Sequence, residues 1–142
     1  MDRSLEVTGL IKPFVDFLKI ANNEIKNLLE IGVNEYLNNQ TSKYYHTNTF
    51  LHRAEKVVFD KVYFPVTVSY NHLDTKFENI KDIFEEYKYI TIIGSAGSGK
   101  STLVKHLFLN SIRQNHKIPV LIELRHLNDN VESLFNLISK KF

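Results

Sequence analysis

A glycine-rich stretch in the second half of the chain has the residue types and spacing of a phosphate-binding loop. It matches the pattern G-x-x-x-x-G-K-[ST] in full. Gly97 and Gly99 lack Cβ atoms, so the backbone there can turn successive N–H groups toward an anion. Lys100 would place an ammonium group on the β- and γ-phosphates, and Ser101 would offer a hydroxyl to Mg²⁺. The predicted phosphate-binding residues are Gly94, Ser95, Ala96, Gly97, Ser98, Gly99, Lys100, Ser101 and Thr102.

Apolar segments on both sides of this stretch predict the elements that would position it. A short buried strand is expected over 89–94, and a helix is expected to begin near Gly99, with its positive dipole end at the loop. A second buried strand is expected over 118–124. Strand, helix and strand form a βαβ unit, which implies parallel strands and a right-handed crossover. This context favours phosphate binding over the alternative, a glycine-rich turn that binds nothing.

The first part of the chain has the pattern of an amphipathic helix. Apolar residues recur at spacings of three and four over 10–45. Pro13 suits the first turn of a helix, where its missing N–H is no loss. One helix over about 12–38 and two helices that meet near 22–23 are both compatible with the pattern, and 38–49 is expected to form a loop.

The middle of the chain is rich in β-branched and aromatic residues. Extended structure is expected over 57–68, and Pro65 favours an edge strand or a linker there. Thr75 and Glu78 have the spacing of a capping box and predict the start of a further helix. A last amphipathic stretch lies at 131–139. The fold class is therefore α/β, with an N-terminal α-helical segment followed by the start of a P-loop parallel sheet.

Nucleotide hydrolysis also requires an acidic residue at the end of a neighbouring strand. Glu123, in the strand expected after the loop helix, is the candidate, although a strand in that position is usually not the one that carries this acid. The catalytic residues therefore stay unknown. We expect that the chain, lacking this Walker B acid, does not hydrolyse nucleotide by itself.

Composition excludes several other classes. The chain has 142 residues, a formal net charge of +2 and no cysteine, so a disulfide framework or a cysteine-bound zinc is impossible. The balanced charge does not favour a nucleic acid or an anionic membrane as partner. No apolar run approaches the roughly 20 residues that cross a bilayer. The 6 histidines have no ligand-like spacing. We expect a cytoplasmic protein.

Two sequence blocks resemble the start of a NACHT domain, a family of STAND switch ATPases. The first is the loop itself, matched at its glycines and at Lys100 and Ser101. The second is "KIPVLIELRHLND", matched at Pro119, Glu123, Leu124 and Arg125. The preceding "KVYFPVTVSYN" resembles the connector found ahead of bacterial NACHT domains. The resemblance covers about 60–130.

The resemblance implies a division of the chain and a function. Residues 1–50 would be a helical effector or adaptor, 51–74 an extended connector, and 75–142 the incomplete N-terminal part of the NACHT domain. The parent protein would bind ATP or ADP with Mg²⁺ and form a homo-oligomer when it senses a ligand, whose identity is unknown. Its role would be innate-immune or antiphage defence signalling, and the chain is expected to be a fragment. The alternative is a non-enzymatic, self-associating helical module with a vestigial phosphate loop.

Overall fold

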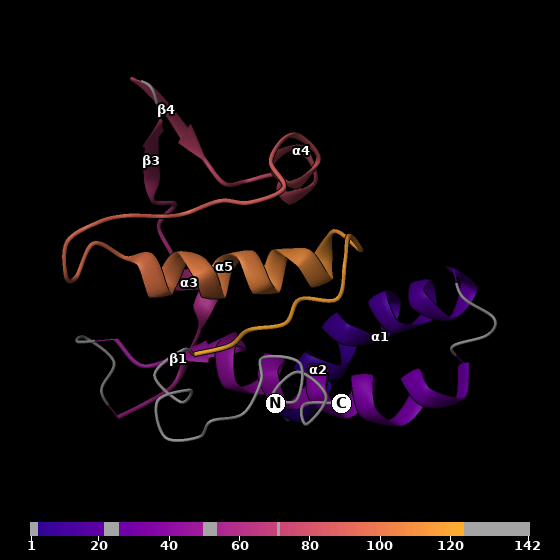
Figure 1. The fold of residues 1–142 in the computed structure, drawn as a ribbon. Coiled ribbons are helices and arrows are strands. Elements are labelled where there is room, and N and C mark those ends of the chain that lie inside the picture. Colours follow the sequence, from indigo (N-terminus) through magenta and orange to yellow (C-terminus); the bar gives the residue numbers. More distant parts are fainter. Residues whose placement is uncertain (1–2, 22–25, 50–53, 71, 124–142) are drawn as a thin grey trace, which may run out of the picture.

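A computed structural model describes residues 3–21, 26–49, 54–70 and 72–123. The fold combines helices with two small antiparallel sheets, so its coarse class is α/β (Figure 1). In chain order, the elements are α1 (Arg3–Ala21), α2 (Lys26–Tyr45), β1 (His46–Thr47), β2 (Val57–Val58), α3 (Phe59–Val62), β3 (Thr67–Tyr70), β4 (Leu73–Lys76), α4 (Ile80–Glu86) and α5 (Lys100–Arg113).

The N-terminal segment forms two helices, and both are longer than the sequence predicts. Pro13 lies inside α1 instead of in its first turn. The buried Val7 and Ile11 precede it, and burying two such side chains contributes roughly as much as an internal proline costs, about 3 kcal/mol. Helix α2 continues through the predicted loop to Tyr45, because Tyr44 packs in the core despite its polar neighbours.

The stretch predicted to be extended, 57–68, and its neighbours form short elements instead of one extended segment. Strand β1 pairs with β2 in antiparallel register, with His46 opposite Val58. One helical turn, α3, interrupts the predicted extended stretch and buries Phe59. Strands β3 and β4 form a hairpin that pairs Thr67 with Lys76.

The predicted capping box is wrong. Thr75 lies in β4, and α4 begins instead after Asn79, whose side chain accepts a hydrogen bond from the Lys81 N–H at 3.3 Å. Asparagine is among the residues that best fill this position. A single polar side chain immediately before the helix therefore caps it without a partner three residues further on.

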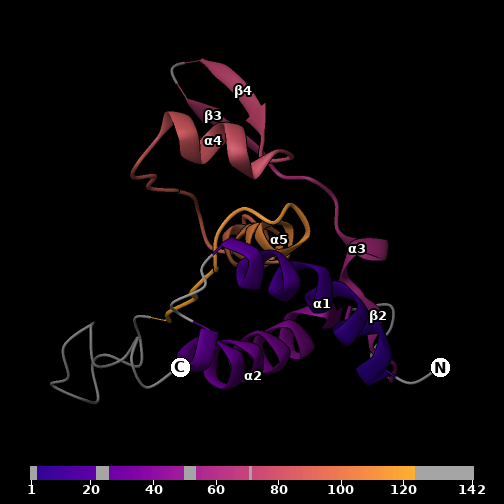
Figure 2. The ribbon, with the colours of Figure 1, turned by 90° about the vertical axis from the view of Figure 1, so that its right-hand side faces the viewer.

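Helix α5 lies in the middle of the molecule. Figures 1 and 2 show the α1–α2 pair on one side of α5, and the β3–β4 hairpin with α4 on the other. The main core is formed between α5 and the N-terminal helices, and α3 contributes Phe59 to it. Its buried members are Val7, Ile11, Val33, Tyr36, Leu37, Tyr44, Phe59, Phe108, Leu109 and Ile112.

The predicted parallel βαβ unit is not present in the described part of the chain. Neither 88–95 nor 116–123 contains a strand. Tyr89 is 84% exposed and Ile93 is 90% exposed, although the pattern predicted a buried strand there. A strand exists only where a neighbour completes its hydrogen bonds, and apolar sequence alone does not supply one. The amphipathic stretch 131–139 lies outside the described residues.

Of the helices in the described part of the chain, none is both long and apolar enough to cross a membrane.

Candidate phosphate-binding site

The glycine-rich loop leads directly into α5, as the sequence predicts. Gly99 is the N-cap of this helix and has φ 84° and ψ 8°, a left-handed conformation that glycine adopts without steric cost. Gly97, with φ 78°, is the second left-handed glycine of the loop. The Leu103 N–H closes the first helical turn on the Gly99 carbonyl at 2.8 Å.

The side chain of Lys100 folds back into the loop. Its ammonium group donates hydrogen bonds to the carbonyl oxygens of Gly94 at 2.7 Å and of Ser95 at 2.6 Å. It also lies 3.3 Å from the Ser98 hydroxyl. A positive charge is therefore fixed inside the ring of backbone that the sequence identifies as the anion cradle.

Close packing within the loop explains the glycine at 94. A Cβ atom at this position would lie 2.6 Å from the Ser98 hydroxyl oxygen, a distance that atoms of this kind do not tolerate. A side chain at 94 would therefore force the Ser98 hydroxyl to move away, whereas at Gly97 and Gly99 the left-handed dihedral angles are what favour glycine.

The start of α5 is chemically suited to an anion. Gly99 has no side chain, so the N-cap residue accepts no hydrogen bond from the first N–H groups of the helix. Ser101 and Thr102 are exposed on the first turn. Uncapped helix N–H groups, an ammonium group and an exposed hydroxyl are the donors that bind phosphate and a phosphate-bound Mg²⁺. The residues present therefore fit a nucleotide phosphate with its metal ion.

Two side chains, one on α5 and one at its C-cap, hold the start of α4 and the segment before it, and sequence reasoning missed both. The Gln114 carboxamide accepts a hydrogen bond from the Ile80 N–H and donates one to the Glu78 carbonyl, each at 3.0 Å. The ring Nε2 of His106 lies 3.2 Å from the Phe77 carbonyl oxygen. All three contacts bridge about 30 residues of sequence or more, and no local pattern indicates them.

The ring of His106 is partly buried, and its Nε2 also lies 2.9 Å from the Asn110 amide nitrogen. Its ring stacks on Tyr63 with centroids 4.2 Å apart. Burial lowers the pKa of His106 below its ordinary value of 6.5, and the hydrogen bond from the ring to the Phe77 carbonyl opposes this shift only in part. The neutral ring is therefore the form that the packed structure favours.

Glu123 lies against α2. Its carboxylate is 3.5 Å from the Lys43 ammonium group. Burial raises the pKa of the nearby Tyr44 to about 12, and the negative charge of Glu123 adds to this effect. The acid that the sequence offered for hydrolysis thus contacts the N-terminal helices in this structure.

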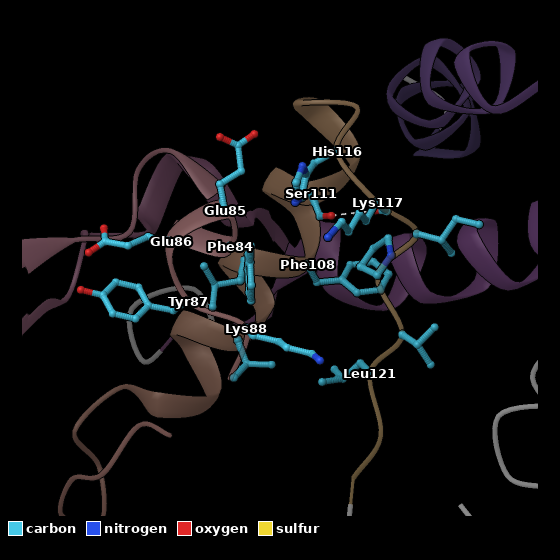
Figure 3. Close-up of a pocket in the computed structure, with 15 residues that line it drawn as sticks. Phe84, Glu85, Glu86, Tyr87, Lys88, Phe108, Ser111, His116, Lys117 and Leu121 are labelled. Carbon is cyan, nitrogen blue, oxygen red and sulfur yellow. Dashed lines mark hydrogen bonds between the residues drawn. The ribbon is translucent and has the colours of Figure 1, made fainter. Parts of the chain in front are cut away.

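A separate cavity of about 530 Å³ opens between α4, the second half of α5 and the chain that follows α5. Figure 3 shows Phe84 and Phe108 among its walls and Lys88 extending toward Leu121. Among the residues that the structure describes, no group of three or more His, Cys, Asp or Glu side chains is placed to hold a metal ion. A metal at the loop would therefore rely on phosphate oxygens, water and the Ser101 hydroxyl.

Comparison with known proteins bears directly on this loop. Residues 73–141 match the family model of novel STAND NTPase 3. The match supports a STAND-class NTPase for this half of the chain. It spans the hairpin strand β4, α4, the glycine-rich loop and α5, and it does not extend to the N-terminal helices.

A curated relative shares a shorter region. The chain is 39% identical over 49 residues to the small ribosomal subunit biogenesis GTPase RsgA of Lactobacillus acidophilus. This alignment covers 34% of the chain and only 16% of that protein. The chain matches no solved structure.

Proposed function

We propose that the chain is the N-terminal part of a STAND-class NTPase and that its glycine-rich loop binds the phosphates of a nucleotide. The observation that carries this proposal is the position of Lys100. Its ammonium group is held by the carbonyl oxygens of the loop. The loop leads into a helix whose N-cap residue, Gly99, provides no side-chain hydrogen bond. The STAND family match over 73–141 and the shared region with a GTPase support it.

The proposed roles follow from the chemistry of each group. The backbone N–H groups of 94–102 would surround the phosphate oxygens, and Lys100 would exchange its carbonyl partners for them. Ser101 would be the protein ligand of Mg²⁺, whose other ligands are phosphate oxygens and water. The bound nucleotide and metal would supply the chemistry of phosphoryl transfer. Because Glu123 contacts Lys43, we expect little or no turnover from this chain.

The proposal includes a parallel sheet beside α5. Residues 88–93 and 116–123 expose apolar side chains, including Tyr89, Ile93 and Val120, which is the composition of strands that need neighbours. We propose that strands from outside the described residues complete this sheet. The cavity between 84–88 and 116–121 would then be filled by them.

The finer assignment follows the NACHT resemblance. We propose a division into a helical segment at 1–50, a connector at 51–74 and a nucleotide module at 75–142. The whole protein would bind ATP or ADP, form homo-oligomers in the cytoplasm and signal in defence. The similarity to a protein named as a GTPase makes GTP the nucleotide to test beside ATP.

A thermal-shift titration tests the central proposal. ATP, ADP and GTP are titrated with and without Mg²⁺ on the wild type and on Lys100→Ala. Ligand at a hundred times its dissociation constant stabilises a protein by about 2.7 kcal/mol. Lys105→Ala, which removes a lysine from the next turn of the same helix, is the matched control. A Mg²⁺-dependent shift that only Lys100→Ala abolishes supports the proposal. No shift in a cooperatively unfolding wild type would refute it and favour the alternative, a helical interaction module.

A further inference from the structure

The helix that carries the loop shares its core with the N-terminal helices. The apolar face of α5 contributes Phe108, Leu109 and Ile112 to the same cluster as residues of α1 and α2. The rings of Tyr44 and Phe108 meet edge to face, with centroids 5.3 Å apart. Because packed interiors are dense and barely compressible, α5 and α2 cannot move independently of each other.

Helix α2 also holds the chain that follows α5. The Tyr36 hydroxyl accepts a hydrogen bond from the Leu121 N–H at 3.1 Å. Tyr36 is only 4% exposed, so water competes little for this bond. About two turns further along α2, Lys43 contacts Glu123. The side chain of Leu121 packs against the common core.

These two contacts differ in strength. The side chains of Lys43 and Glu123 are 60% and 33% exposed, and ion pairs in such settings contribute little. The Tyr36 bond is partly buried, and its loss would leave the Leu121 N–H without that acceptor. The Tyr36 bond is therefore the stronger of these two polar contacts between α2 and 121–123.

We propose that α2 is a coupling element of the nucleotide module: Tyr36, assisted by Lys43, positions residues 121–123 beside α5, so that docking of α2 and nucleotide binding favour each other. The inference rests on the proposed function. The first turn of α5 carries the phosphate-binding groups, while its later turns pack on α2. Nucleotide that fixes the first turn would therefore also fix the packing surface of α2, and coupling between two sites acts equally in both directions.

Tyr36→Phe tests this inference with little disturbance of the core. Phenylalanine keeps the ring and loses only the hydroxyl that accepts from Leu121. The dissociation constant of Mg²⁺-ATP, or of Mg²⁺-GTP if the thermal-shift titration selects it, is measured by calorimetry on the full chain. We expect affinity to fall by about fivefold or more, the lower end of the usual range for coupled sites. Tyr45→Phe, which removes a hydroxyl from the neighbouring residue of α2, is expected to bind like the wild type.

Hydrogen exchange provides a second measurement that a purely structural role would not affect. Nucleotide is expected to slow exchange of the α2 amides over 33–45 in the wild type and to slow it less in Tyr36→Phe. The charge swap Lys43→Glu with Glu123→Lys is expected to bind nucleotide more tightly than Lys43→Glu alone.

The outcomes separate the two proposals. If the wild type binds, Lys100→Ala does not, and Tyr36→Phe binds with unchanged affinity and unchanged α2 protection, the coupling is refuted and the proposed function stands. If the folded wild type binds no nucleotide, both the proposed function and the coupling are refuted. Weaker binding by Tyr36→Phe but not by Tyr45→Phe, with less α2 protection, establishes the coupling.

Discussion

Val66 lies directly against Gly99: a Cβ atom at Gly99 would come within 3.2 Å of the Val66 Cγ2 atom. The segment before β3 thus touches the N-cap residue of α5. We expect Gly99→Ala to destabilise the protein for two reasons. A left-handed φ of 84° costs a residue with a Cβ about 1–2 kcal/mol, and the contact with Val66 adds to this. Urea denaturation measures the loss.

Two comparisons separate these causes. Residue 97 also has a left-handed φ, but nothing lies within 4 Å of a Cβ atom added there. Gly97→Ala should therefore lose only the stability that the unfavourable dihedral angle costs. Gly9→Ala, in the exposed part of α1 with open space around it, should stabilise the protein by about 0.5–1 kcal/mol. Equal losses at 97 and 99 would mean that the contact with Val66 is unimportant.

Gly94→Ala should disrupt the loop by a purely steric route. The new Cβ would lie 2.6 Å from the Ser98 hydroxyl oxygen but 3.4 Å from the Ser98 Cβ, an ordinary contact distance. Removing the hydroxyl should therefore relieve the clash. We expect Gly94→Ala to lower thermal stability and the double variant Gly94→Ala/Ser98→Ala to recover most of it. A double variant less stable than Gly94→Ala would contradict the steric explanation. The matched control is Ser98→Ala alone.

Gln114→Ala should loosen α4 from α5. The substitution removes the donor to the exposed Glu78 carbonyl, which water can replace, and the acceptor of the Ile80 N–H. An unsatisfied buried group costs about 1–3 kcal/mol. Because Ile80 is only 1% exposed, water cannot easily replace the lost acceptor. Faster hydrogen exchange at the Ile80 amide, together with a lower free energy of unfolding, would be the signature. Gln114→Glu keeps the acceptor and should lose less than Gln114→Ala; an equal loss would contradict the assigned acceptor role.

Acid should destabilise the fold through His106. Burial lowers the pKa of His106 from its ordinary value of 6.5, so the unfolded chain binds a proton more readily than the folded one. The free energy of unfolding therefore falls as the pH drops below about 6.5, and this contribution levels off below the folded pKa. Protonation would also place a hydrogen on the ring Nδ1, a buried atom without a partner in the described structure.

The measurement is the free energy of unfolding between neutral and mildly acidic pH. His106→Gln should show a shallower pH dependence than the wild type. Burial lowers the pKa of His116 as well. His116→Gln should therefore lose the part of the pH dependence that comes from His116 and keep the part that comes from His106. An unchanged slope in His106→Gln would exclude the histidine as the cause.

The features that the sequence predicted well depend on neighbouring residues only. The loop motif places left-handed glycines at 97 and 99 and starts a helix immediately afterwards, and the structure has both. The glycine pattern and the helix propensity act over a few residues, so local sequence contains the necessary information.

The features that it predicted poorly depend on distant partners. Residues 38–45 are polar enough to suggest a loop, yet they are helical because Tyr44 packs on Phe108. The strand expected at 89–94 has the right residue types but no neighbour in the described structure. Gln114 and Tyr36 each bind backbone far away in the sequence, and no periodicity can indicate such a bond.

The core shared by the N-terminal helices and α5 has a consequence for biosynthesis. Helices α1 and α2 leave the ribosome first, but the surface that covers Leu37 and Tyr44 arrives only with Phe108 and Ile112. Throughout the translation of the intervening chain, the apolar faces of the nascent helical pair are exposed to water and prone to aggregation. We therefore expect chaperones to engage the nascent chain until α5 has emerged.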